Sequence, residues 1–151
     1  MIELPGMQWS RGPFRISTSQ ELLDINFIHQ YLSKDSYWAR HIPRETVEKA
    51  IQGSLCFGIY HEQEQTGFSR VITDFATLAY LADLFVVEKF RRQGLSKWLL
   101  DCMQLHSALQ DLRRWMLATR DAHGLYQRYG FKKLQSPENI MELHNPGVYG
   151  I

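Results

Sequence analysis

The chain has 151 residues, a usual size for one domain and enough to bury a hydrophobic core. Hydrophobic residues make up 44% and charged residues 22%, and no apolar run is long enough to cross a bilayer, so neither disorder nor membrane insertion is expected. The formal net charge of +1 gives no electrostatic reason to expect nucleic acid as a main partner.

The start of the chain reads MIELPGMQWSRGPF and lacks the basic, apolar and small-residue regions of a secretory signal, so we expect a cytoplasmic protein. Cys56 and Cys102 each lie in an apolar segment outside any CxxC pair, which favours packed, reduced thiols over a disulfide or a metal site. We expect one domain over residues 1–151, with its core in about 14–145.

The N-terminal part predicts a strand followed by two helices. Residues 14–17 are a short strand candidate. Thr18, followed three residues later by Glu21, is the capping-box pattern that begins a helix through ELLDINFIHQYL. Pro43 fits the first position of a second helix, RETVEKAIQ, which Gly53 ends.

The middle of the chain predicts antiparallel strands. Residues 55–61 and 67–73 are apolar and rich in β-forming side chains, and the polar stretch between them indicates a hairpin. A second turn around Asp74 leads into a long strand over residues 77–87.

The C-terminal part predicts a helix, a strand, a short helix and a last strand. Apolar residues recur at helical spacing from Leu95 to Leu109, WMLAT follows as a strand, and a short helix begins near Ala122. A last strand starts at Phe131, and IMELH could pair at a sheet edge. This order of elements predicts an α+β fold with a mixed sheet.

The segment from Tyr80 to Leu105 carries the strongest functional signal. An apolar strand breaks into the polar loop KFRRQGLS and resumes as an amphipathic helix. The first amides of a helix lack internal partners and carry partial positive charge, so this loop could surround phosphate oxygens, with Gly94 allowing close approach. An ordinary tight turn with solvated arginines would explain the loop equally well.

The surroundings of the loop resemble motif A of the GNAT superfamily of acyl-CoA-dependent N-acyltransferases. That motif, (R/Q)xxGx(G/A) between a strand and a helix, is matched by RRQGLS at residues 91–96, with Ser96 where the family usually has Gly or Ala. Downstream, AHGLYQRYGF places Tyr126 four residues before Gly130, similar to the family's helix-to-strand segment. The order of elements also fits over nearly the whole chain. The sequence is identified as a single-domain member of bacterial type.

This resemblance implies a twisted, mostly antiparallel sheet of about six or seven strands with about four helices, in which two strands splay apart at an acyl-CoA cleft. It also implies acetyl-CoA as co-substrate and no metal. The implied cofactor-binding residues are Leu84, Phe85, Val86 and Val87 in the strand, Arg91, Arg92, Gln93, Gly94, Leu95 and Ser96 in the loop, and Tyr126. A bulge in the strand would free an amide to stabilise the oxyanion of acyl transfer.

Acyl transfer to an amine needs a base for the ammonium and an acid for the departing thiolate. The family resemblance gives the acid role to Tyr126, whose alternative is a core tyrosine. Asp83, the one charge within YLADLFVV, is the first candidate base, and a salt-bridged structural acid would explain it equally well. His123 could relay a proton, or it could be a helix-start histidine without a task.

The acceptor side is the least specified. The loop between the two N-terminal helices holds Tyr37, Trp38, Arg40 and His41, which could form a pocket for a small or amino-acid-like amine, with Arg40 or Arg70 for a carboxylate. These aromatics could instead anchor the loop to the core. The predicted activity is N-acetylation of such an amine by direct attack in a ternary complex. A non-catalytic acyl-CoA-binding module and acetylation of a protein amine are the alternatives, and a homodimer is left open.

Overall fold

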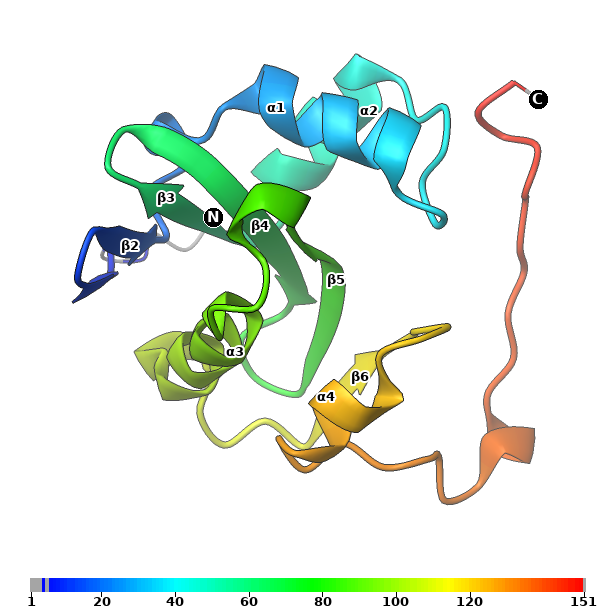
Figure 1. Ribbon diagram of the computed structural model, residues 1–151. Helices are drawn as coiled ribbons and strands as arrows, with labels where there is room; N and C mark the ends of the chain where they lie inside the picture. Colours follow the sequence, from blue (N-terminus) through cyan, green and yellow to red (C-terminus); the bar gives the residue numbers. More distant parts are fainter. Residues whose placement is uncertain (1–3, 5, 151) are drawn as a thin grey trace.

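A twisted sheet runs through the computed structural model, which describes residues 4 and 6–150 (Figure 1). Within these residues the sheet has six strands that are hydrogen-bonded in sequence order. Only β5 and β6 are parallel, and the other neighbours are antiparallel, so the predicted α+β fold with a mixed sheet is confirmed. The strands are β1 (Gln8–Arg11), β2 (Phe14–Ser17), β3 (Leu55–His61), β4 (Glu64–Thr73), β5 (Leu78–Val86) and β6 (Arg114–Leu117).

Helices cover both faces of the sheet (Figure 1). Side chains alternate along β3, so Phe57 and Ile59 belong to one buried cluster and Cys56 to another. The first cluster packs under α3 and α4, and the second under α1 and α2. The helices are α1 (Ile25–Gln30), α2 (Arg44–Gln52), α3 (Leu95–Leu105) and α4 (His123–Gln127).

The first helix begins later than the capping-box pattern predicts. The Thr18 hydroxyl accepts a hydrogen bond from the Met7 amide at 2.9 Å and so is not a cap. Asp24 caps α1 instead, because its carboxylate accepts from the Phe27 amide at 3.0 Å. The second helix agrees with the prediction: Pro43 immediately precedes α2, which Gly53 ends.

The two predicted turns of the central sheet are present. β3 and β4 form the expected hairpin, although β4 begins at Glu64, earlier than predicted. The Asp74 carboxylate accepts from the amides of Ala76, Thr77 and Leu78 and from the Thr77 hydroxyl, which closes the turn into β5.

The predictions at the two ends of the sheet were wrong. The sequence analysis missed β1, a short strand whose burial pattern is mostly exposed and therefore carries little hydrophobic alternation. It also predicted a strand from Phe131 and allowed that IMELH could pair at a sheet edge, yet neither segment joins the sheet within the described residues. The chain after Phe131 instead lies across a cavity from β6, too far away for a ladder.

β5 contains the expected bulge. Phe68 of β4 pairs with Phe85 and Arg70 pairs with Ala82, so Ser69 alone opposes both Asp83 and Leu84. Asp83 adopts the left-handed conformation with φ 57°, as the first residue of such a bulge can. The Ser69 hydroxyl donates to the Ala82 carbonyl at 3.0 Å and secures the distorted ladder.

The bulge is followed by divergence of β5 from β6. The two strands pair only from Leu78 to Leu81, against Arg114–Leu117, whereas β5 continues to Val86. Among the described residues, no strand pairs with the β6-facing edge of β5 beyond Leu81. The predicted splay is therefore present and leaves backbone groups of β5 open to a ligand.

Gly67 keeps β4 close to β5 just beyond the bulge. A β-carbon at this position would lie 2.8 Å from the Phe85 carbonyl oxygen and 2.9 Å from the Ile59 side chain. The strand spacing on which the open edge depends therefore requires glycine here.

Replacing Gly67 with alanine should lower the free energy of unfolding by about 1–3 kcal/mol, because the added methyl group forces backbone apart. Urea denaturation of both proteins measures the difference. Gly124→Ala is the matched control, since a β-carbon there meets nothing within 4 Å. Equal stability of the Gly67 variant and the wild type would contradict the close approach.

Candidate active site

The loop after β5 and the start of α3 form a cavity of about 320 Å³. A 3-10 turn, Glu88–Phe90, carries the chain out of β5, and the next four residues lead to α3. Most of the predicted loop residues line this cavity, and Phe90, Lys97 and Leu125, which were not predicted, line it as well. The lining residues are Val86, Phe90, Arg91, Arg92, Gly94, Leu95, Ser96, Lys97 and Leu125.

Two left-handed residues shape this loop. Arg92 has φ 65° and Gly94 has φ 74°, and Gly94 directly precedes the first turn of α3. The first hydrogen bond of the helix runs from the Trp98 amide to the Gly94 carbonyl at 3.0 Å. The amides before Trp98 therefore have no helical partner, and the cavity at this helix start is positive and suited to phosphate.

Arg91 and Gln93 help to hold the loop. The Arg91 guanidinium donates to the Val86 carbonyl at 2.8 Å and to the Tyr31 hydroxyl at 3.1 Å. The Tyr31 ring in turn stacks on Phe85 at 3.8 Å between centroids. Tyr31 was missed by the sequence analysis, because only the folded chain brings it beside Arg91. The Gln93 side chain donates to the Phe90 carbonyl at 3.4 Å and does not line the cavity.

The four strand residues predicted to contact the cofactor differ in whether they face the rest of the protein or the open edge of β5. The Val87 amide donates to the Thr66 carbonyl at 2.9 Å, so it faces β4 and not the splayed edge. Phe85 contributes its side chain to the cluster under α1 and α2. Leu84 and Val86 lie in the diverging part of β5, where a backbone ligand could pair.

Tyr126 is buried in α4. Its ring packs edge-on against Phe131 with 5.8 Å between centroids. Burial, with smaller effects from the nearby Tyr37 and Asp121, raises the pKa of Tyr126 to about 12. The phenol therefore keeps its proton at neutral pH, as a proton donor must.

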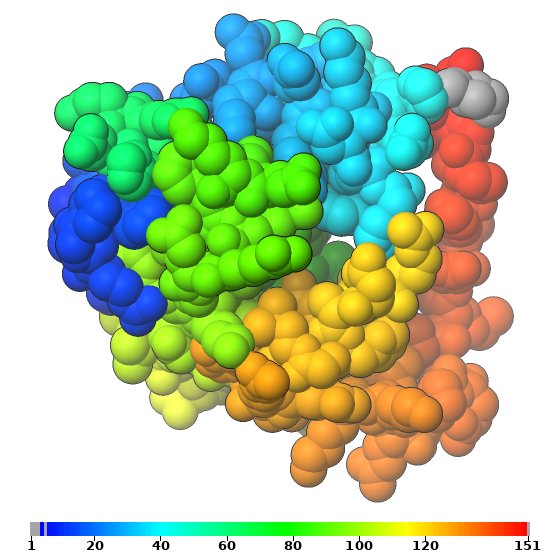
Figure 2. Space-filling view, in the orientation of Figure 1, coloured from blue at the N-terminus to red at the C-terminus, as the bar shows by residue number. Residues whose placement is uncertain are grey.

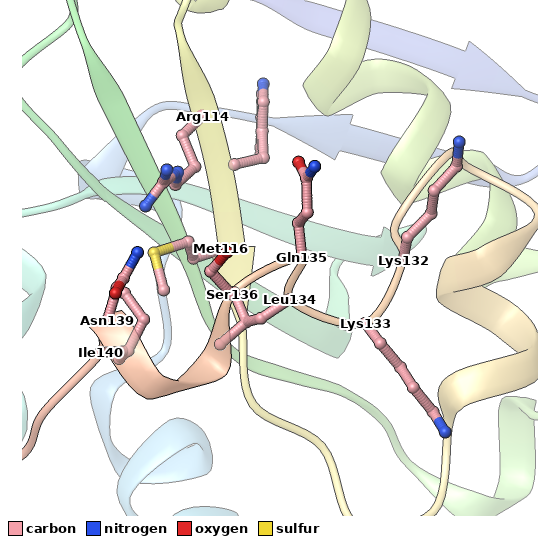
Figure 3. A pocket seen from close by; sticks show the side chains of 10 residues that line it. Arg114, Met116, Lys132, Lys133, Leu134, Gln135, Ser136, Asn139 and Ile140 are labelled. Atoms are coloured by element: carbon pink, nitrogen blue, oxygen red, sulfur yellow. The ribbon is translucent and has the colours of Figure 1, made fainter.

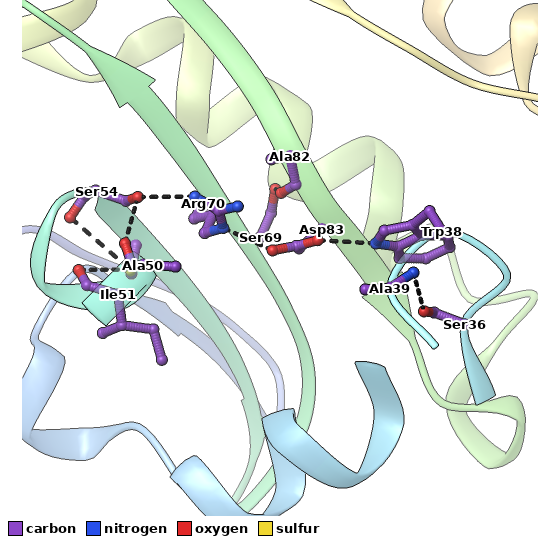
Figure 4. A network of polar contacts seen from close by, with 11 residues as sticks. Ser36, Trp38, Ala39, Ala50, Ile51, Ser54, Ser69, Arg70, Ala82 and Asp83 are labelled. Carbon is purple, nitrogen blue, oxygen red and sulfur yellow. Dashed lines mark hydrogen bonds and ion pairs between the residues drawn. The ribbon is translucent and has the colours of Figure 1, made fainter. Parts of the chain in front are cut away.

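Asp83 is held between two donors (Figure 4). Its carboxylate accepts from Arg70 Nε at 2.6 Å and from Trp38 Nε1 at 2.8 Å. Arg70 also donates to the Ser54 hydroxyl at 3.1 Å. Three residues given different roles by the sequence analysis thus form one network, and the exposed fractions of the Arg70 and Asp83 side chains are only 18% and 10%.

Tyr37 links the α1–α2 loop to the loop after β6. Its hydroxyl accepts from the Arg120 amide at 2.9 Å, and the Arg120 guanidinium lies 3.8 Å from the centre of its ring. Tyr37 also meets Trp38 edge-on at 5.0 Å. Figure 2 shows these loops, in cyan and yellow, at the rim of a hollow beside β5. Arg120 was missed, because an exposed arginine in a loop carries no sequence signal.

Three other residues predicted for the site are exposed and take no part in the side-chain contacts described above. His123 is exposed at the start of α4, and Arg40 and His41 are exposed in the α1–α2 loop. His41 adopts the left-handed conformation with φ 67°, and its amide donates to the Ser33 carbonyl. It therefore has a turn-forming role in the loop.

Both cysteines are free, buried thiols, as predicted. Burial raises the pKa of Cys56 and of Cys102 to about 12, which leaves them protonated and poorly nucleophilic. In the described part of the chain, no group of three or more His, Cys, Asp or Glu side chains is placed to hold a metal ion. No helix among the described residues combines the length and apolarity needed to cross a membrane.

Comparisons with known proteins agree with this geometry. The sequence model of the Acetyltransferase (GNAT) domain matches residues 52–133. A candidate acetyltransferase of Gibberella zeae is 34% identical over 140 residues, which cover 78% of each chain. The crystal structure of a candidate GNAT-family acetyltransferase from Xanthomonas campestris pv. campestris is 49% identical, with TM-score 0.89 over 91% of this chain and 97% of that one.

A GNAT family acetyltransferase from Elizabethkingia anophelis, solved with acetyl-CoA bound, shares the fold at TM-score 0.60 and 18% identity, over 91% of this chain and 92% of that one. The family match and the relatives show that the chain belongs to the GNAT acetyltransferase family and is an N-acetyltransferase. The splayed mixed sheet of the structure agrees with this family.

Replacing Asp83 with asparagine should lower the free energy of unfolding by about 3 kcal/mol, because Arg70 would stay mostly buried without a counter-charge. Asparagine tolerates the left-handed conformation, so the change isolates the charge. Urea denaturation measures the loss. The control is Glu48→Gln at the half-exposed Arg44–Glu48 pair, where about 0.5 kcal/mol or less is expected. Losses of similar size at both pairs would contradict a structural role for the Asp83 charge.

Proposed function

We propose that the protein transfers the acetyl group of acetyl-CoA to a primary amine of a small, amino-acid-like acceptor by direct attack in a ternary complex. The observation that carries the proposal is that the cavity at the start of α3 adjoins both the open edge of β5, through Val86, and the helix of the protonated Tyr126, through Leu125.

The donor would lie along the splay between β5 and β6. Backbone groups of Leu84 and the amide of Val86 would pair with the pantetheine arm, as a further strand would, while the Val86 carbonyl stays bonded to Arg91. The amides of Leu95 and Ser96, with Arg92 and Lys97 at the cavity, would receive the pyrophosphate. The Ser96 hydroxyl adds a donor at a position where the family usually has Gly or Ala.

The chemistry then needs two proton transfers. The acceptor ammonium loses one proton to a base, and its nitrogen bonds to the thioester carbonyl carbon. The carbon–sulfur bond then breaks, the sulfur takes a proton from the acid, and the second proton lost by the nitrogen restores that acid, so that one proton is released to solvent. We assign protonation of the departing sulfur to Tyr126. Asp83 is committed to Arg70 and Trp38, so we assign it a positioning role. His123 lies one turn before Tyr126 on the exposed start of α4 and would relay the ammonium proton to solvent.

The acceptor would enter beside Tyr37 and Trp38. Arg70, predicted as a carboxylate partner, is taken by Asp83 and Ser54. Arg40 is exposed in the same loop as Tyr37, and Arg120 stacks on the Tyr37 ring, so we assign the acceptor carboxylate to Arg120 or Arg40. A small amine with an acidic group fits this combination of aromatic walls and guanidinium.

Replacing Tyr126 with phenylalanine should lower kcat by about 100-fold, because the thiolate loses its proton donor while ring packing is kept. Since the pKa of Tyr126 is raised to about 12, the wild-type rate should not fall through loss of this proton up to about pH 10. The release of the CoA thiol measures both the kcat of the variant and the pH dependence of the wild-type rate.

The control is Tyr129→Phe, which removes a hydroxyl bonded to the Lys97 carbonyl and should leave kcat unchanged. Equal kcat in the Tyr126 variant and the wild type would contradict the proposal that Tyr126 protonates the departing sulfur.

The activity itself is tested by incubating the protein with isotopically labelled acetyl-CoA and a cell extract, followed by mass spectrometry. The expected result is label on a small primary amine, which accumulates about 100-fold more slowly in the reaction with Tyr126→Phe. Label on protein amines alone would contradict the proposed acceptor class. Thiol release without any labelled amine would contradict the transfer.

A further inference from the structure

Tyr31 directly follows α1 and has its backbone fixed on both sides. Its amide donates to the carbonyls of Phe27 and Ile28, and its carbonyl accepts from the Ser36 amide at 2.9 Å. The bond to Ser36 closes a single π turn over Tyr31–Asp35, and turns of this type are frequent at functional sites. The α1–α2 loop, with its acceptor-side aromatics, begins where this turn ends.

The ring of Tyr31 is fixed as well. It lies almost parallel to the ring of Phe85, with 3.8 Å between centroids and 7° between planes. Phe85 is buried and packs against Phe27 and Phe68, with centroids at 5.7 and 6.1 Å. A stiff ring on a buried support presents its hydroxyl in one position, so a hydrogen bond to this hydroxyl costs little side-chain entropy.

The hydroxyl of Tyr31 meets the guanidinium of Arg91. Nη2 of Arg91 donates to this hydroxyl at 3.1 Å, and Nε donates to the Val86 carbonyl at 2.8 Å. Arg91 also lines the cavity at the start of α3. Because a guanidinium is a rigid fork, fixing two of its nitrogens fixes the third. Among the described residues Nη1 forms no hydrogen bond, which leaves it for a phosphate oxygen.

Positive charge alone does not distinguish this cavity. A second cavity, of about 350 Å³, lies between β6 and residues 132–136 and is lined by Arg114, Lys132 and Lys133 (Figure 3). Within the described residues, the cavity at the start of α3 differs in adjoining a helix start and in having an arginine held by two hydrogen bonds. We therefore look to the anchoring of Arg91, and not to charge, for the selection of a pyrophosphate.

We propose that Tyr31 is a positioning residue for acetyl-CoA. It holds Arg91 against the end of β5, so that the guanidinium is already in place when the pyrophosphate arrives. Tyr31 acts through Arg91 and takes no part in proton transfer. This inference rests on the proposed donor site, and it adds to that site a contribution from the helical layer that carries Tyr37 and Trp38.

Titration calorimetry with CoA tests this role. Tyr31→Phe should raise the dissociation constant by about 10-fold, because the ring still stacks on Phe85 while the guanidinium loses its fixed acceptor. The free energy of unfolding, measured with urea, should change little, since the stacking is kept. The matched control is Arg114→Gln, which removes an arginine from the second cavity and should leave the dissociation constant unchanged.

Two further measurements separate positioning from a general structural effect. Pantetheine lacks the pyrophosphate, so its dissociation constant, measured by NMR titration, should be equal for the wild type and Tyr31→Phe. In a chain that already carries Arg91→Gln, adding Tyr31→Phe should raise the dissociation constant for CoA by less than about twofold, because the hydroxyl acts through the guanidinium.

Three results would overturn the inference while leaving the proposed function intact. These are equal CoA affinity of Tyr31→Phe and the wild type, an equal loss of affinity for CoA and for pantetheine, and a full 10-fold effect of Tyr31→Phe in the chain with Arg91→Gln. A wild type that binds no CoA would contradict the donor site itself, and this inference with it.

Discussion

The ion pair between Asp83 and Arg70 is the interaction on which the rest of the site depends. A carboxylate within a central strand is costly to bury, and here it is compensated by Arg70 at 2.6 Å and by the Trp38 indole at 2.8 Å. The same residue takes the left-handed conformation that begins the bulge. One side chain thus fixes a distortion of β5 and ties it to β4 and to the α1–α2 loop.

The distortion lies just beyond the part of β5 that pairs with β6. The two strands pair only as far as Leu81, and the chain then turns through Arg92 and Gly94 into α3. The open strand edge and the helix start are therefore consecutive in sequence and continuous in space. Tyr126 lies in α4, and Tyr37 of the α1–α2 loop is near enough to contribute to its raised pKa. We propose that acetyl transfer takes place beside this phenol.

Local patterns were enough to predict most of the sheet and the donor loop. The hairpin, the Asp74 turn and the loop around Gly94 each depend on neighbouring residues, and all were correct. The bulge and the splay came from the family resemblance, because side-chain identity does not reveal backbone geometry. Contacts distant in sequence, such as Arg70 with Asp83 and Tyr37 with Arg120, could not be predicted, since tertiary packing alone selects the partner. The prediction of a strand from Phe131 was wrong, because a local sequence pattern does not show whether the segment lies close enough to a sheet edge to pair with it.

Hydrogen–deuterium exchange with and without acetyl-CoA tests the central claim, that the splayed edge of β5 and the start of α3 form the donor site. Amides in the diverging part of β5 and in residues 94–97 should exchange more slowly when the ligand is bound, because it would pair with them directly. The amides of β3, already paired on both sides, should be unaffected. Binding without protection of these two segments, or with protection confined to the cavity between β6 and residues 132–136, would contradict this assignment of the donor site.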